Sequence, residues 1–170
     1  TLTLPDIGYA DVSLIVINSN GCKSDLSKPN LLYIFDTLAP EAPNVNLVTV
    51  VSNTAIRIVW DEVAVEDFAA YRIIRRESGG GSYIKVVQLA AQTTTQFIDE
   101  SVNTLTTSYC YVIQTVDQCG NVSNTKEIIS HCTIELSSTT YSDKVELNWT
   151  PYQGCKIASY EIFRSKQGAT

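Results

Sequence analysis

The residues best suited to catalysis are His131, the only histidine in the chain, and its neighbour Cys132. Nucleophilic catalysis needs a thiol or hydroxyl beside a base that is itself held in place. Both residues fall in a stretch of β-type sequence, where consecutive side chains point to opposite faces of a strand. The pair therefore cannot form a catalytic dyad, and we interpret His131 as a structural residue at the end of a strand, near a joint between domains.

Acidic residues form a second candidate site. They gather at Asp61, Glu62, Glu66 and Asp67, with a further pair at Asp99 and Glu100. Two carboxylates flanking a cleft can hydrolyse a glycoside, and oxygen-rich loops can bind Ca²⁺. The stretch lacks both Asp-x-Asp-x-Asp spacing and an aromatic sugar platform, which favours a solvated acidic loop. The Gly79-Gly-Gly81-Ser82 run lacks the Gly-Lys-Ser/Thr ending of a phosphate loop and predicts a hairpin turn. We therefore expect no catalytic, cofactor or metal site.

Five cysteines provide the remaining chemistry: Cys22, Cys110, Cys119, Cys132 and Cys155. Their spacing fits neither a CxxC metal site nor a redox motif. Scattered cysteines in β-type sequence favour an oxidising, exported environment, where disulfides persist. Cys110 and Cys132 are both eleven residues from Asn121, so a hairpin folded there would allow a cross-strand disulfide between them. The odd count implies a thiol that is free or has its partner outside this sequence.

The elements that position these residues are β-strands. Tyr109, Tyr111, Ile113 and Thr115 alternate along one face of an extended segment. The Asp-Gln-Cys-Gly-Asn run that follows, 117–121, predicts a tight turn into a strand over 126–133. Further short strands are predicted at 45–51, 54–60, 70–76, 83–87 and 94–99. Such strands without helical periodicity predict an all-β fold, an antiparallel sandwich. Its predicted core aromatic residues are Trp60, Tyr71, Tyr109 and Tyr111.

An internal repeat of 89 residues indicates more than one such unit. Trp60, Tyr71, Ile73 and Arg75 recur as Trp149, Tyr160, Ile162 and Arg164. The segment Lys144–Arg164 therefore predicts a second copy of two strands, with Trp149 and Tyr160 in its core.

Two prolines, Pro40 and Pro43, indicate an extended linker between domains. The segment before them has three short predicted strands, at 1–4, 9–17 and near 31–35, too few for an independent sandwich. We predict four parts: the closing part of a β-sandwich at 1–36, the linker at 37–43, a complete sandwich at 44–133 and the opening strands of another at 134–170.

The stretch around Tyr109 resembles the pattern Tyr-x-Tyr-x-Val-x-Ala-x-Asp-x-x-Gly-Asn-x-Ser of fibronectin type III domains in bacterial surface proteins. The resemblance implies that Tyr109 is the tyrosine-corner residue, whose hydroxyl bonds backbone a few residues upstream. Residues 1–36 resemble the end of a PKD-type or similar immunoglobulin-like domain. In such a tandem, the end of one sandwich meets the next domain's loop with Cys155, so a Cys132–Cys155 disulfide is the alternative to Cys110–Cys132. Cys22 and Cys119 would lie in equivalent turns of successive domains.

Residues 44–170 also resemble the arrays of large Bacteroidetes surface proteins. The features that carry this resemblance are the Cys-Gly-Asn turn, the His-Cys-Thr-Ile joint and the Trp-Thr-x-Tyr motif at 149–152. That group includes gliding-motility-associated adhesins exported by type IX secretion. The resemblance implies a secreted protein at the bacterial cell surface, with the type IX secretion machinery as a partner and Thr37 as an O-glycosylation site.

The sequence thus favours a non-catalytic spacer in a large secreted adhesin, which projects a binding region and serves attachment or gliding. The alternative is an accessory region of a secreted polysaccharide-degrading enzyme. Expected partners are neighbouring β-sandwich domains of the same chain and a glycan or surface ligand. A formal net charge of −6 with scattered basic residues argues against nucleic acid. The chain has no run of about 18 apolar residues, so we expect no membrane insertion.

Overall fold

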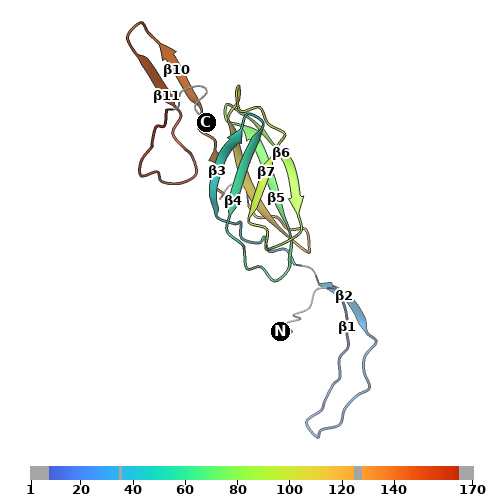
Figure 1. Ribbon diagram of the computed structural model, residues 1–170. Helices are drawn as coiled ribbons and strands as arrows, with labels where there is room; N and C mark the ends of the chain where they lie inside the picture. The colour runs from blue at the N-terminus through green and yellow to red at the C-terminus, as the bar shows by residue number, and fades with distance from the viewer. Residues whose placement is uncertain (1–7, 35, 125–127, 165–170) are drawn as a thin grey trace. The chain divides into compact units, whose positions relative to one another are not determined.

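The computed structural model describes residues 8–34, 36–124 and 128–164, and the regular elements within these ranges are all β-strands (Figure 1). The chain divides into two compact units, Thr1–Leu38 and Ala39–Thr170, and this division falls within the predicted linker. The strands are β1 (Gly8–Val12), β2 (Asn30–Ile34), β3 (Val45–Ser52), β4 (Ala55–Trp60), β5 (Phe68–Glu77), β6 (Gly80–Leu89), β7 (Gln96–Asp99), β8 (Tyr109–Asp117), β9 (His131–Cys132), β10 (Leu136–Thr140) and β11 (Val145–Trp149). The predicted all-β fold is confirmed.

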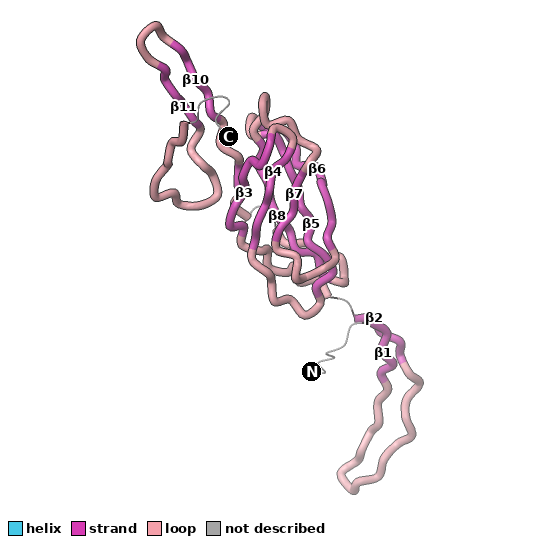
Figure 2. Tube along the Cα trace, in the orientation of Figure 1, coloured by secondary structure: helices cyan, strands magenta, loops and turns pink. Residues whose placement is uncertain are grey.

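Strands β3 to β9 form a sandwich of two antiparallel sheets (Figure 2). One sheet has the strand order β3-β4-β7, and the other has the order β6-β5-β8-β9. Strands β5 and β8 are the central pair of the second sheet and are in register from Phe68↔Asp117 to Glu77↔Tyr109. Strands β3 to β7 overlap the segments that alternation predicted, because those segments hide one apolar face against the opposite sheet. Strands β5 and β6 are longer than predicted, so the hairpin turn between them is 78–79 and not the predicted Gly79–Ser82.

The core lies between the two sheets. Its buried members are Val45, Val48, Ile56, Ile58, Trp60, Tyr71, Ile73, Val102, Tyr109, Tyr111 and Ile113. The rings of Trp60 and Tyr71 meet edge to face, with centroids 5.5 Å apart. The four aromatic residues predicted for the complete sandwich all belong to this core, since each alternates inward along its strand.

A buried carboxylate links the two sheets across this core. Asp99, the last residue of β7, is 1% exposed. Its side chain accepts hydrogen bonds from the hydroxyl of Tyr111 on β8, at 2.9 Å, and from the guanidinium of Arg75 on β5, at 2.5 Å. The backbone N–H and hydroxyl of Ser101 donate to the other carboxylate oxygen. Asp99 thus ties the end of one sheet to two strands of the other.

The protonation states in this network follow from burial and hydrogen bonding. Burial alone raises the pKa of Asp99, but hydrogen bonds from Ser101, Tyr111 and Arg75 outweigh it, so the pKa lies below its ordinary value. Burial and the neighbouring carboxylate raise the pKa of Tyr111, which keeps the phenol protonated as a donor. The network is therefore an ionised carboxylate held by a neutral phenol and a cation.

Strand β9 is much shorter than predicted. The sequence predicted a strand over 126–133, of which 126–127 lie outside the described residues, but only His131–Cys132 pair with β8. Near the turn, Val116 bridges Val122, and continuing that register would place Cys110 opposite Ile128. Instead Cys110 lies opposite Cys132, four residues further along. The register of β9 is therefore displaced by four residues from that of the turn, and only its two residues pair with β8.

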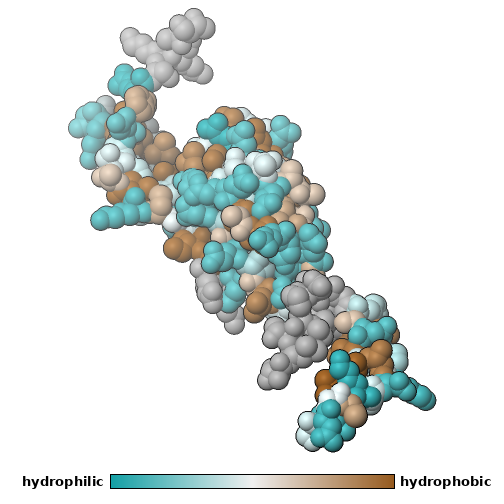
Figure 3. Space-filling view, turned by 90° about the horizontal axis from the view of Figure 1, so that it is seen from below, coloured by the Kyte–Doolittle hydropathy of each residue, from teal (hydrophilic) through white to brown (hydrophobic). Residues whose placement is uncertain are grey.

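The N-terminal unit contains the hairpin β1–β2, paired from Gly8↔Ile34 to Val12↔Asn30. Beyond β1 its two arms are joined by the isolated bridge Ile17↔Lys23. Several apolar side chains are exposed here, and the space-filling view shows hydrophobic residues at the surface of this hairpin (Figure 3). The strand predicted near 31–35 is present as β2, whereas the one predicted at 1–4 lies outside the described residues.

The segment after the sandwich forms a hairpin of its own, in which Leu136 pairs with Trp149 and Thr140 with Val145. Of the two strands that the repeat predicted within 144–164, the first is present as β11 and the second is absent, since 156–164 contain no strand. Trp149 and Tyr160, predicted as core, are 37% and 41% exposed, although their rings touch edge to face. The physical reason is that the described residues offer no second sheet to cover this face.

The carboxylate of Asp99 provides a direct test of the link between the sheets. We expect Asp99→Asn to lower the free energy of unfolding by about 3 kcal/mol, because it leaves the charge of Arg75 half-buried without its counter-ion. Urea denaturation followed by circular dichroism measures this. The matched control is Glu62→Gln at an exposed site, where we expect a change below about 0.5 kcal/mol. Equal losses for the two variants would contradict the link.

Candidate functional site: the disulfide-linked joint

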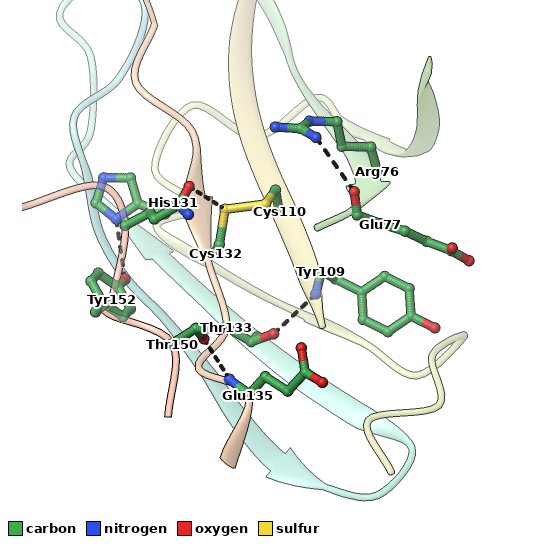
Figure 4. The surroundings of a disulfide bond; sticks show 11 residues. Arg76, Glu77, Tyr109, Cys110, His131, Cys132, Thr133, Glu135, Thr150 and Tyr152 are labelled. Carbon is green, nitrogen blue, oxygen red and sulfur yellow. Dashed lines mark hydrogen bonds between the residues drawn. A yellow bond between two sulfur atoms is a disulfide. The ribbon is translucent and has the colours of Figure 1, made fainter. Parts of the chain in front are cut away.

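The joint begins with a disulfide between Cys110 and Cys132 (Figure 4). The two residues lie directly opposite each other on β8 and β9, with their Cα atoms 4.0 Å apart. Next to the disulfide, the N–H of Thr133 donates to the carbonyl of Tyr109, and the hydroxyl of Thr133 accepts from the N–H of Tyr109. The short strand β9 is thus fixed to β8 by a covalent bond and by backbone pairing.

The other cysteines are free thiols in exposed positions: Cys22, Cys119 and Cys155. Of the two pairings considered from sequence, the structure therefore has Cys110–Cys132 and not Cys132–Cys155. Cys22 follows Gly21 and Cys119 precedes Gly120, so these two thiols lie on opposite sides of similar turns.

His131 lies beside the disulfide and is 3% exposed. Its ring meets that of Tyr152 edge to face, with centroids 5.9 Å apart, and its Nδ1 lies 3.1 Å from the Tyr152 hydroxyl. The same hydroxyl accepts a hydrogen bond from the N–H of Val48 on β3, at 2.9 Å. Tyr152 therefore bridges both sheets of the sandwich from the segment that follows them.

Hydrogen bonding and burial define the surroundings of His131. The Tyr152 hydroxyl accepts from the N–H of Val48 and also pairs with Nδ1 of His131, and the tautomer of the imidazole decides which group donates in this second bond. Burial lowers the pKa of His131, which favours the neutral ring. A neutral histidine with its Nδ1 occupied, next to an oxidised cysteine, has no nucleophile to activate, in agreement with the expectation of a structural histidine.

A glycine allows the loop to approach this histidine. Gly154 has φ of +121°, and a Cβ there would lie 2.2 Å from Cγ of His131. The adjacent backbone also pairs, since the N–H of Cys132 donates to the carbonyl of Gln153 at 3.2 Å. Next to the loop, the N–H of Thr150 donates to the carbonyl of Glu135, and the N–H of Glu135 donates to the hydroxyl of Thr150. The loop 151–154 therefore packs on the end of the sandwich through side chains and backbone.

The acidic loop does not assemble a site of comparable order. Asp61, Glu62 and Glu66 are exposed, as a solvated loop predicts. Asp61 accepts hydrogen bonds from the amides of Asn44 and Asn46, which lower its pKa. Asp61 thus stabilises the start of β3 beside the end of β4. Asp99, grouped with Glu100 in the sequence, instead belongs to the core.

The role of Asp99 and Arg75 was missed from sequence, although a signal was present. Arg75 alternates with the inward-facing Tyr71 and Ile73, and Asp99 alternates in the same way with Phe97. A charge at an inward position of each of two strands predicts a buried pair, because an isolated buried charge is too costly.

Comparisons with known proteins address the fold. No protein-family model matches the chain, and no curated protein does. Among solved structures, the chicken CNTN1 FN1-FN3 domains match with a TM-score of 0.50 and 20% identity, over 77% of this chain and 44% of that one. The sandwich is a fibronectin type III-like domain.

Two further structures match at lower TM-scores. The fn3 domain of human contactin 1 has a TM-score of 0.42 and 18% identity over 76% of this chain and 93% of that one. The titin kinase with its flanking domains has a TM-score of 0.42 and 18% identity over 56% of this chain. The chain spans only 16% of that titin structure. The likeness to the chicken CNTN1 domains concerns the fold.

The fibronectin type III-like domain has the expected tyrosine corner. The hydroxyl of Tyr109 accepts a hydrogen bond from the N–H of Asn103, six residues upstream, at 3.2 Å. The guanidinium of Arg75 also lies over the Tyr109 ring, 5.1 Å from its centroid. Tyr109 thereby closes the loop that leads into β8.

Removal of the disulfide tests its contribution to the fibronectin type III-like domain. We expect the double variant Cys110→Ala/Cys132→Ala to lose about 2 to 4 kcal/mol of unfolding free energy, because the unfolded chain gains conformational freedom. Urea denaturation under oxidising conditions gives this value. Cys119→Ala removes an exposed thiol and should leave the value unchanged; a loss as large as that of the double variant would contradict the assignment.

The buried His131 predicts a loss of stability in mild acid. Its folded-state pKa lies below that of the unfolded chain, so its contribution is complete above about pH 6.5 and is lost as pH falls towards the folded pKa. Melting temperatures measured in steps from about pH 7.5 to 5 should fall. His131→Gln cannot titrate and should flatten this dependence; an identical slope in both proteins would exclude His131 as its source.

Proposed function

We propose that this chain is a non-catalytic spacer segment of a large exported cell-surface adhesin, which holds a binding region away from the cell and serves attachment or gliding. The observation that carries the proposal is the joint, where Tyr152 bonds His131 and Val48 at the end of the sandwich. A spacer has to transmit position and force from one domain to the next. Side chains that bridge the end of one domain and the start of the following segment suit that task.

The chemistry of the joint supports the same proposal. Its potentially reactive residues have structural partners: Cys132 is in a disulfide, and the buried His131 is hydrogen-bonded to the Tyr152 hydroxyl. The 89-residue repeat predicts that 134–170, the segment that supplies Tyr152 to this joint, opens the next domain. Neighbouring β-sandwich domains of the same chain are therefore the partners that we propose first.

An exported location is supported by the disulfide, because such bonds persist in oxidising compartments. Within the described residues no helix is long and apolar enough to cross a membrane. The Bacteroidetes resemblance extends the proposal to type IX secretion, with Thr37 as an O-glycosylation site. Thr37 is exposed, which a glycosyltransferase requires.

Protease treatment of intact cells that make the protein tests this proposal. With an antibody against residues 44–133, we expect one large band that external protease removes without lysis, because a projecting spacer is accessible from outside. A cytoplasmic protein probed on the same blot should stay intact and serves as the control. Protection of the band until the cells are lysed would contradict surface exposure, and a band of ordinary enzyme size in the medium would contradict the adhesin.

A further inference from the structure

An apolar groove lies on the segment that follows the sandwich. It has a volume of about 1110 Å³ and is open to solvent along the hairpin β10–β11 and residues 160–164. Its apolar lining includes Val145, Leu147, Trp149, Tyr160 and Ile162. Trp149 and Leu147 are 37% and 38% exposed, values well above those of core residues. A contiguous apolar surface of this kind indicates a binding surface.

The internal repeat indicates what would cover the groove. Its five lining residues above lie 89 positions after Ile56, Ile58, Trp60, Tyr71 and Ile73, which are at most 1% exposed. In the complete sandwich those residues form one core with the inward side chains of β8, Tyr109, Tyr111 and Ile113. The groove thus has the half of a core that β4 and β5 supply, and it fits a segment that resembles β8.

The N-terminal hairpin repeats the turn of β8 in atomic detail, with an offset of 99 residues. The bridge Ile17↔Lys23 corresponds to Val116↔Val122. Gly21 and Gly120 have φ of +82° and +87°. Five hydrogen bonds of one turn match five of the other. Between backbone atoms, Asn18 N to Cys22 O matches Asp117 N to Asn121 O, Gly21 N to Asn18 O matches Gly120 N to Asp117 O, and Ser24 N to Val16 O matches Ser123 N to Thr115 O. From backbone to side chain, Val16 N to Ser24 Oγ matches Thr115 N to Ser123 Oγ, and Cys22 N to Asn18 Oδ1 matches Asn121 N to Asp117 Oδ1.

This correspondence identifies the core-facing side of the hairpin. Val12, Leu14 and Val16 take the positions of Tyr111, Ile113 and Thr115, all three of which are fully buried in the sandwich. In the hairpin, Leu14 and Val16 are 71% and 70% exposed. The chain therefore has two exposed apolar faces that correspond to the two opposing halves of its own complete core.

We propose that a second copy of this chain covers the groove with its N-terminal hairpin, residues 8–34. Val12, Leu14 and Val16 of one copy pack on Leu147, Trp149 and Tyr160 of the other, as Tyr111 and Ile113 pack on Ile58, Trp60 and Tyr71 within the sandwich. A pair joined by one such contact keeps one free hairpin and one free groove. The contact is therefore heterologous, and further copies add head to tail at either end.

Sedimentation of the full 170-residue chain over a concentration series tests the proposal. We expect species larger than the 18.7 kDa monomer that grow with concentration and do not stop at a dimer. Leu14→Lys on the hairpin and Leu147→Lys in the groove should each abolish this growth, since a lysine on either apolar face opposes burial. Both sites are exposed, so neither variant threatens the fold.

A mixture of the two variants makes the test specific. Leu14→Lys retains its groove and Leu147→Lys retains its hairpin, so equal amounts should form dimers and nothing larger. Ile15→Lys and Asn148→Lys, one residue away and on the opposite faces, are the matched controls and should associate like the parent chain. A monomer at every concentration, association that survives both single variants, or a mixture that remains monomeric would each overturn the proposal.

Discussion

The structure depends on one constraint: a β-sheet with one apolar face needs a second sheet to cover it. Only residues 45–133 provide both sheets among the described residues, and only there is a core fully buried. Asp99 strengthens that arrangement because its carboxylate bonds Tyr111 and Arg75 on the opposite sheet. Large apolar burial brings the sheets together, and one ionic network fixes their positions at the end of β7.

The residues best suited to chemistry, His131, Cys110 and Cys132, hold chain segments together. The disulfide compensates for the small size of β9, whose two residues contribute little backbone pairing of their own. With Cys132 fixed, His131 is held where the Tyr152 hydroxyl and the Gly154 backbone can close on it. The disulfide fixes β9 to the sandwich, and hydrogen bonds from β9 hold Tyr152 and Gln153 in the joint. This use of histidine and cysteine is consistent with the spacer role that we propose.

The features predicted correctly from the sequence are those that depend on the local alternation of residues. Alternation gave β3 to β8 and the inward Trp60, Tyr71 and Tyr111, because strand periodicity and burial are tied residue by residue. The length of β9 could not be predicted, since its register is displaced by four residues from the register of the turn. Trp149 and Tyr160 were predicted as core from the repeat, yet burial also requires an opposing sheet. The role of Asp99 was missed because Asp99 stands next to Glu100 in an acidic pair, and its partners Arg75 and Tyr111 are distant in sequence.

The two similar turns separate local from distant causes. The turns at Gly21 and Gly120 have the same backbone path and the same hydrogen bonds, although only the second belongs to a complete sandwich. Their bonds join residues at most eight positions apart, so they form without help from another sheet. Burial differs completely, because Ile113 meets β4 and β5 whereas Leu14 meets solvent. The hairpin therefore has the shape of a sandwich strand pair before it has a core, and this preformed shape lowers the entropic cost of binding an apolar groove.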